Sequence, residues 1–349
     1  MTRPAGGSGV LGVDSGGSGL RAVLAVDGGR DTAPLTSEEP VRTGPRGIDA
    51  GHLLAQLVPM ARQLMADAGV GTLRSVAIGA AGLTSLGDAL RAELPSGLAG
   101  ELGVRRLALV ADAVTAYTGA LGQRVGAVVA AGTGMITIGT DLESWHRADG
   151  WGHLLGDCGG GSWIGQAGLE AALRAYDGRP GGSAPLLARV EEMFGSAHAL
   201  PGQLYPRTDR PAVLASFAPE VAACADGDPV AADILAAAAR HITDSLAAVC
   251  PTDKGGERDG GESAASGEVQ VAFTGGLFKM GDPLLVPLRA ALAERLPYAR
   301  QVPAAGDPLS GAVRIALDLA GDRLTLPRDD SMLYVVTDAP ETRPSDHSP

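Results

Sequence analysis

Three short glycine runs, each placed directly after an apolar strand-like segment, most strongly constrain the fold of this chain. They lie at residues 14–19, 132–134 and 274–276, after VLGV, GAVVAA and VQVAF. Glycine lets the backbone turn sharply and approach a ligand closely, so that N–H groups can point at the ligand. The repetition predicts an α/β protein whose strands end at small turns that line a binding site.

Apolar periodicity predicts the elements around these turns. A strand–turn–strand unit covers 9–26, a polar loop follows to about residue 49, and GAVVAAGTGMITIG reads as a second hairpin. Asp228 stands at an N-cap and Pro229 at the first position of a long helix. The remaining predicted strands are 75–79, 107–110 and the run VQVAF, and the predicted helices are 52–68, 114–121, 161–178, 228–250, 283–295 and 309–320.

The length of 349 residues favours two domains. We expect an N-terminal lobe over 1–110, on which the last helix, 309–320, packs back, and a C-terminal lobe over 111–326. The segment 253–268 reads as a flexible insertion because it is polar and glycine-rich. Residues 327–349 are expected to form a disordered tail, in which only the run MLYVV docks locally.

Charge and cysteine usage exclude several classes of protein. The net charge is −12 without a basic cluster, so nucleic acid is not an expected partner. The three cysteines have no CxxC or zinc spacing, which is typical of reduced thiols in a cytoplasmic protein. The N-terminus lacks the apolar region of a signal peptide, and no apolar run is long enough to span a membrane, so no membrane association is expected.

The first turn, GVDSGGSGLRAVL, contains one carboxylate, Asp14. No lysine follows the last glycine, and LRAVLAV alternates like a strand, so the turn is neither a P-loop nor a dinucleotide fingerprint. Asp14 could hold a hydrated Mg²⁺ beside amides that receive phosphate. The alternative is a plain tight hairpin with an aspartate in its turn.

Two further positions suggest phosphate chemistry. The turn AAGTGM offers the Thr133 hydroxyl and bare glycine amides, and two such turns could grip opposite sides of one polyphosphate. Asp112 follows a strand, where α/β sheets place their ligands, so it could act as a general base. Its alternative role is that of a helix N-cap.

The stretch GWGHLLGDCGGGSWIG combines aromatic surface with a carboxylate in glycine-rich backbone, which suits sugar recognition. Within it, His153 is predicted to be structural and Trp163 to belong to a helix core. Cys158 is predicted to be an inert wall residue, because nothing in the sequence suggests an activating partner.

Taken in order, these segments resemble the N-acetylglucosamine kinase family, which is grouped with the benzoyl-CoA-reductase-activator-type ATPases in the actin/hexokinase-like superfamily. The segments are GVDSGGSGLRAVL, VADAV, AAGTGMITIG, GWGHLLGDCGGGSWIG and FTGGLF, within residues 9–320. The resemblance implies an α/β, two-lobed actin/hexokinase-like ATPase fold, each lobe a mixed sheet flanked by helices, that closes over ATP, Mg²⁺ and an amino sugar.

The resemblance also implies roles for individual residues. Asp14 would organise the metal, and Asp112 would be the catalytic base for the 6-hydroxyl of the sugar. ATP would be held by Gly16, Gly17, Ser18, Thr133, Gly134, Gly275 and Gly276, and the hexosamine by Asp112, Gly150, Trp151, Gly152 and Asp157.

The sequence departs from the family pattern in the phosphate turns and near the sugar. The first turn reads GGSG where the family has GGGT and a basic residue, and Met135 and Ile136 follow the second turn. The segment TGPRGID has no asparagine, and GDCG replaces GDEG at Asp157 and Cys158. Glucosamine, another hexose derivative and a non-sugar acceptor therefore stay open as alternatives to N-acetylglucosamine.

The leading hypothesis is a cytoplasmic, homodimeric kinase that uses ATP and Mg²⁺ to phosphorylate the 6-hydroxyl of N-acetylglucosamine or glucosamine. A second hypothesis is an activator-type ATPase that couples nucleotide state to a partner protein; its iron–sulfur cluster would need paired cysteines, which this sequence lacks. A third is a nucleotide-sensing or sugar-binding module without catalysis.

Overall fold

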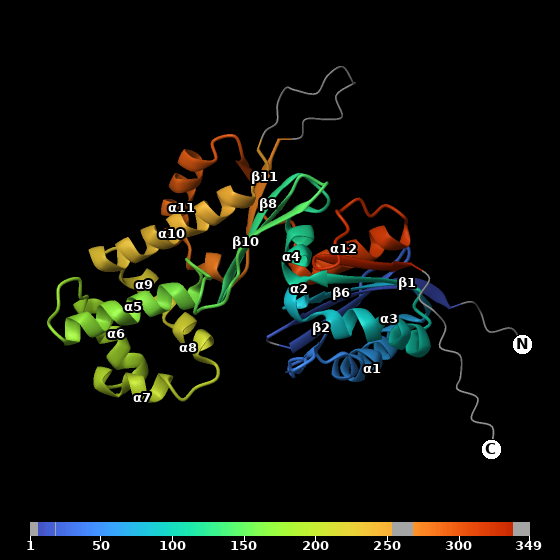
Figure 1. Ribbon diagram of the computed structural model, residues 1–349, viewed down its shortest axis with the longest axis horizontal. Coiled ribbons are helices and arrows are strands. Elements are labelled where there is room, and N and C mark those ends of the chain that lie inside the picture. The colour runs from blue at the N-terminus through green and yellow to red at the C-terminus, as the bar shows by residue number, and fades with distance from the viewer. Residues whose placement is uncertain (1–5, 18, 253–267, 338–349) are drawn as a thin grey trace, which may run out of the picture. The chain divides into compact units, whose positions relative to one another are not determined.

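The computed structural model describes residues 6–17, 19–252 and 268–337, and their contacts divide the chain into two units (Figure 1). The first unit comprises Met1–Arg124, Asp141–Trp145 and Ala304–Pro349. The second comprises Val125–Thr140 and His146–Pro303. This grouping differs from the sequence-based boundary at residue 110, because the helix that follows Asp112 packs with the first unit.

The first unit is built on a six-stranded mixed sheet in the order β13-β7-β6-β1-β2-β3. Strand β1 pairs antiparallel with β2 and parallel with β6, and β6 pairs parallel with β7. The strands are β1 (Gly7–Gly16), β2 (Gly19–Val26), β3 (Leu35–Ser37), β6 (Val70–Ala80), β7 (Arg106–Ala111) and β13 (Leu333–Thr337), beside the small hairpin β4 (Thr43–Gly44) and β5 (Gly47–Ile48). The helices are α1 (Ala50–Ala68), α2 (Leu83–Leu86), α3 (Asp88–Leu102), α4 (Asp112–Leu121) and α12 (Pro308–Ala320).

Side-chain alternation along β1 divides the core of this unit into two layers. Leu11 and Val13 join the apolar cluster that includes the buried leucines of α1 and α3. On the opposite face, Gly12 lies against Val313 of α12, so close that a Cβ would approach its backbone N to 2.7 Å. Helix α12 therefore packs on β1 as the sequence predicted, and the missing side chain makes the close approach possible.

The second unit is built on a five-stranded sheet in the order β10-β9-β8-β11-β12. Strand β8 pairs antiparallel with β9 and parallel with β11, and β11 pairs parallel with β12. The strands are β8 (Gly126–Ala131), β9 (Met135–Thr140), β10 (Trp145–Asp149), β11 (Gln270–Thr274) and β12 (Arg300–Gln301). The helices are α5 (Gly161–Tyr176), α6 (Ala184–Phe194), η1 (Ala197–Ala199), α7 (Leu200–Leu204), α8 (Arg210–Ser216), α9 (Ala218–Cys224), α10 (Pro229–Val249), η2 (Gly276–Met280) and α11 (Asp282–Arg295).

Local sequence signals set several of these elements. Both predicted hairpins form, as β1–β2 and β8–β9. Helix α10 begins at Pro229, and the Asp228 carboxylate accepts a hydrogen bond from Val230 N at 3.2 Å. Asp49 caps α1 in the same way through His52 N, at 2.9 Å, so this helix begins two residues earlier than apolar spacing suggested.

Two sequence-based expectations are corrected. The segment before residue 49 is not wholly loop, because it contains the short strands β3, β4 and β5. Residues 327–331, expected to belong to a disordered tail, include a turn in which Leu333 N donates to Asp329 O at 2.8 Å. The run MLYVV docks locally, as predicted: it forms β13, which pairs antiparallel with β7 and buries Leu333 fully. A free sheet edge and an apolar run explain that order. The predicted insertion lies outside the described residues apart from Glu268, and so do residues 338–349 of the tail.

Candidate active site

The first turn joins β1 to β2 and leaves its glycines open. A Cβ at Gly16 or Gly17 would have no heavy atom within 4 Å, so the backbone here is accessible to a ligand. Ser18 lies outside the described residues. Gly19 has φ +123 and its Cβ would lie 2.0 Å from Ser37 O, which fixes glycine at the start of β2.

Asp14, the predicted metal ligand, is held by an arginine from the opposite strand. Arg21 is its direct partner in the β1–β2 register. The guanidinium donates to Asp14 Oδ2 through Nη2 at 2.6 Å and Nε at 3.2 Å, and through Nη1 to Asp307 Oδ2 at 3.2 Å. Asp307 in turn caps α12 by accepting from Ser310 N at 2.9 Å. The turn is thereby joined to the start of the last helix.

This network places one guanidinium between two carboxylates. Although burial works in the opposite direction, the Asp14 and Asp307 carboxylates raise the pKa of Arg21. Burial also opposes the shift of Asp307, but hydrogen bonds from Ser310 and the charge of Arg21 lower the pKa of that carboxyl. Arg21 is thus a cation beside the first turn, held by the carboxylates of Asp14 and Asp307.

Asp14 can offer a Mg²⁺ ion one carboxylate oxygen. Both side-chain contacts of Asp14 use Oδ2, so Oδ1 is the oxygen that could face a hydrated ion. Within the described ranges, no three His, Cys, Asp or Glu residues gather into an all-protein metal site. One carboxylate with water and phosphate ligands is a common way for proteins to bind Mg²⁺.

Asp112 lies at the same end of the sheet as Asp14. Ser15 is aligned with Ala80, and Ala80 with Ala111, along the parallel strands β1, β6 and β7. Because β6 lies between β1 and β7, the backbones at Ser15 and Ala111 are two strand spacings apart, or about 10 Å. Asp112 begins α4 with an exposed side chain, and its Oδ1 accepts from Ala113 N at 2.9 Å. The N-terminus of a helix favours a negative charge at this position.

The second turn, between β8 and β9, is anchored to the start of α5. Gly161 N donates to Gly132 O at 2.9 Å, and Ser162 N donates to Thr133 O at 2.8 Å. These two amides of the helix terminus are therefore bonded to the turn, while the Thr133 side chain remains exposed.

Asp157 lies directly against this turn. Its Oδ1 accepts from Gly152 N at 3.1 Å, and its carboxylate also accepts from the backbone N–H of Met135. A Cβ at Gly134 would lie 2.4 Å from Asp157 Oδ2, so only glycine fits there without displacing the carboxylate. The second turn and the predicted sugar-contact segment thus meet at one side chain.

Asp149 holds the other side of the segment. Its carboxylate accepts from Asp157 N at 2.6 Å and from Cys158 N at 2.9 Å. Burial, with the neighbouring charge of Asp149, raises the pKa of Asp157 despite the two backbone hydrogen bonds. Burial and the same two carboxylates raise the pKa of Cys158, in keeping with the predicted inert thiol.

The aromatic residues of the segment have separate surroundings. Trp151 is 66% exposed, and the Arg147 guanidinium carbon lies 4.3 Å from the centre of its ring. Trp163 packs against the core of the second unit, as predicted, and meets His241 edge-on at 5.0 Å. Trp151 is the aromatic surface of this segment that a ligand can reach.

The third turn, after β11, also packs against the second. Gly275 has φ +105, and its Cβ would lie 2.1 Å from Ala131 O, immediately before the Gly132–Gly134 turn. Gly276 has open space around its Cβ position and begins η2. The second unit therefore gathers Thr133, Gly134, Gly275 and Asp157, whereas Asp14, Gly16, Gly17 and Asp112 belong to the first unit.

Comparison with known proteins identifies the family. The model of the BadF/BadG/BcrA/BcrD ATPase family matches residues 11–316. The chain belongs to this family. A structure from Chromobacterium violaceum, proposed to be an N-acetylglucosamine kinase, is 25% identical and covers 90% of this chain and 100% of its own, with a TM-score of 0.66. A glucokinase of the ROK family from Streptomyces griseus, 18% identical, covers 90% of this chain and 99% of its own with a TM-score of 0.54.

One curated relative also matches, over a shorter stretch. The N-acetylmuramic acid/N-acetylglucosamine kinase of Clostridium acetobutylicum is 40% identical over 75 residues, which are 21% of this chain and 24% of that protein. The match thus spans about a quarter of the relative. The fold of this BadF-family member is accordingly the expected two-lobed actin/hexokinase-like ATPase fold.

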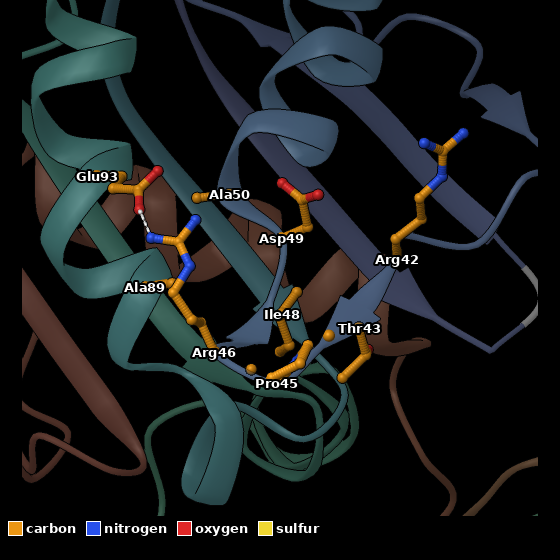
Figure 2. A pocket seen from close by; sticks show the side chains of 11 residues that line it. Arg42, Thr43, Pro45, Arg46, Ile48, Asp49, Ala50, Ala89 and Glu93 are labelled. Carbon is orange, nitrogen blue, oxygen red and sulfur yellow. Dashed lines mark ion pairs between the residues drawn. The ribbon is translucent and has the colours of Figure 1, made fainter.

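The first unit of this protein also has a pocket, which is lined by the segment TGPRGID, the expected sugar loop of the first lobe. Figure 2 shows this cavity of about 470 Å³ around the β4–β5 hairpin, with Arg46 reaching towards Glu93. The two charged groups are 3.8 Å apart, and Asp49 lies between Arg46 and Arg42 in the view. Gly47, with φ +93, brings the hairpin against Leu86 O. Charges of both signs line the pocket in place of the asparagine typical of the family.

The sequence reading missed Arg21, Asp149 and Asp307. A signal for Arg21 existed, because residues 14 and 21 are equally far from the centre of the predicted hairpin and so face each other. Asp307 had no comparable signal for its contact with Arg21, which lies 286 positions away along the chain. Asp149 bonds to Asp157 N and Cys158 N, which are near in sequence, but the glycine-rich stretch between them has no periodicity from which this contact could be predicted. No helix in the described part of the family member is long and apolar enough to cross a membrane.

Proposed function

We propose that this BadF-family ATPase is a kinase that transfers the γ-phosphate of ATP to the 6-hydroxyl of N-acetylglucosamine or glucosamine. The observation that carries the proposal is the alignment of Asp14 and Asp112 at one end of the first sheet, about two strand spacings apart. That arrangement pairs a carboxylate suited to Mg²⁺ with a second carboxylate suited to an alcohol.

The second unit supports the proposal with neutral donors next to a carboxylate. The Thr133 hydroxyl and the Gly134 amide are suited to phosphate, and Asp157 with Gly152 N is suited to sugar hydroxyls. Trp151 adds an accessible aromatic face for the apolar side of a sugar ring.

In the proposed reaction, the oxygen of the sugar 6-hydroxyl bonds to the γ-phosphorus, and Asp112 accepts the proton of that hydroxyl. The bond from that phosphorus to the β,γ-bridging oxygen breaks, and ADP leaves. Phosphoryl transfer needs positioning and charge neutralisation more than covalent help. Arg21 keeps Asp14 oriented, while the turn amides receive phosphate oxygens. When bound at Asp14, Mg²⁺ would neutralise part of the polyphosphate charge.

The acceptor is tested by measuring ADP release over a sugar panel: N-acetylglucosamine, glucosamine, N-acetylmannosamine, N-acetylmuramic acid and glucose. The muramic sugar is included because the curated relative carries it in its name. We expect ATP turnover that depends strongly on an amino sugar, with the phosphate on its 6-oxygen. Turnover that ignores every sugar and responds to a protein partner would instead support the activator-type hypothesis.

The base is tested by Asp112→Asn, which keeps the size of the side chain and removes its proton acceptor. We expect kcat to fall about 10²- to 10⁴-fold while ATP binding is retained. Asp88→Asn is the matched control, because Asp88 also lies in a helix first turn of the same unit, with a side chain 96% exposed. Near-normal turnover by Asp112→Asn would refute the assignment.

The cytoplasmic location and the homodimer stay predictions from the sequence. Size-exclusion chromatography with light scattering tests the dimer directly. A monomer at working concentration would contradict it without affecting the proposed reaction.

A further inference from the structure

The second unit contains a cavity outside the residues assigned to ATP and sugar. It measures about 450 Å³ and lies among α5, α7, α8 and the loop after Gly152. Six leucines line it. Leu169 and Leu200 are almost fully buried, whereas Leu154 is 82% exposed. The cavity therefore has an apolar floor and an apolar, water-exposed rim, which is the character of a pocket for an apolar group.

Two residues of this cavity come from the segment proposed to hold the sugar. His153 and Leu154 line the cavity, and both directly follow Gly152, whose N–H binds the Asp157 carboxylate. The cavity wall therefore begins one residue after the N–H group that bonds to Asp157. This adjacency favours an occupant that belongs to the acceptor substrate rather than an unrelated molecule.

The rim of the cavity shows what kind of group it suits. Leu154 and Tyr205 are each more than three-quarters exposed, an uncommon exposure for two large side chains around one cavity. Among the polar lining residues, Gln166 donates to Glu170 at 3.2 Å and Arg210 donates to Tyr205 O at 3.0 Å, while His153 also contributes to the wall. The wall is thus mainly apolar, and the charged groups of Glu170 and Arg210 each bond to a neutral partner.

We infer that this leucine-lined cavity is an acceptor subsite for an N-acyl chain longer than acetyl on a glucosamine ring. The inference rests on the proposed function for the position of the ring. It names the substrate class as N-acyl glucosamines, with the ring at Gly152 and Asp157 and the chain in the cavity. The transfer step is unchanged: the 6-oxygen takes the γ-phosphoryl group, and ADP leaves.

The test measures binding, by calorimetry without ATP, of N-acetyl-, N-butanoyl- and N-hexanoyl-glucosamine to the full chain. Each fully buried methylene raises affinity about fourfold. In a cavity that is partly open to water, each methylene gains about half of that free energy, which is about twofold in affinity. The hexanoyl compound has four more methylenes than the acetyl compound, so we expect it to bind about 16-fold more tightly. A flat series in the unaltered protein would overturn the inference.

Leu204→Gln tests the cavity itself, because Leu204 is half-buried in its wall. We expect the 16-fold gain to shrink to about threefold or less, with binding of the acetyl compound unchanged. Leu187→Gln is the matched control, since Leu187 is a half-buried leucine of α6 in the same unit that does not line the cavity. Equal effects of both changes would refute a specific subsite.

Two further outcomes separate this inference from its alternatives. If Leu204→Gln alters the sedimentation coefficient and leaves the acyl series intact, the face is an interface between copies, and the inference is wrong. If the series is steep but no member accepts phosphate from ATP, the subsite stands and the proposed kinase activity fails. If N-acetylglucosamine is phosphorylated and the series is flat, the activity stands and the subsite fails.

Discussion

Replacing Gly134 by alanine tests the meeting point of the second turn and the sugar-contact segment. An added Cβ would lie 2.4 Å from Asp157 Oδ2 and 3.0 Å from Asp157 Cγ. Ordinary contact begins at 3.4 Å, so the carboxylate must retreat by about 1 Å. A retreat of that size stretches the 3.1 Å hydrogen bond from Gly152 N beyond bonding distance.

The expected cost combines crowding with weakened hydrogen bonds. Overpacking typically costs about 1–3 kcal/mol. A hydrogen bond to a charged group is worth about 1.5–3 kcal/mol, and less at a partly exposed carboxylate such as Asp157. We therefore expect Gly134→Ala to lower the free energy of unfolding by about 2–4 kcal/mol, or Tm by about 5–15 °C.

Gly132→Ala is the matched control from the same turn. Its Cβ would have no heavy atom within 4 Å, and Gly132 N would keep its hydrogen bond to Gly134 O. We expect its Tm to equal or slightly exceed that of the unaltered protein, because alanine restricts the unfolded chain. Unfolding is followed by tryptophan fluorescence, since Trp151 and Trp163 both report on the second unit. A Tm for Gly134→Ala within about 2 °C of the control would refute the contact.

The remaining predictions concern charge. Arg21→Met should lower the free energy of unfolding, measured by chemical denaturation, by about 1–2 kcal/mol. A double-mutant cycle with Asp14→Asn should give a coupling free energy of at least about 0.5 kcal/mol. Purely additive effects of the two changes would contradict the pairing. The pKa of Asp157 is raised, mainly by burial and also by the charge of Asp149, so ionising this carboxyl costs the native protein stability as pH rises above about 4. Asp157→Asn avoids that cost, so its stability should rise relative to the unaltered protein between about pH 4 and 7. Although burial opposes the shift, the pKa of Asp307 is lowered by hydrogen bonds from Ser310 and the charge of Arg21, so its stabilisation is lost as pH falls below about 4. Asp307→Asn should therefore be less stable than the unaltered protein above about pH 4, and the difference should shrink below that pH. Thermal melts on both sides of about pH 4 test both signs, and a stability difference from the unaltered protein that does not change with pH in either variant would refute them.

Short-range signals in the sequence predicted much of the framework. The hairpins follow from glycines between alternating apolar runs, and the start of α10 follows from Asp228 and Pro229. Asp112 could be predicted at a strand end because the apolar run before it stops at Ala111. These features depend on residues a few positions apart, so composition and periodicity encode them directly.

The contacts within the candidate site were decided only by the tertiary structure. Arg21 bonds Asp307 across 286 positions of the chain, and nothing near either residue marks the other as a partner. The contact of Gly134 with Asp157 depends on how α5 anchors the second turn, and the leucine-lined cavity requires helices separated by long connections. Such contacts arise when whole elements bury their apolar faces together, and that packing is a property of the complete fold rather than of any local run of residues.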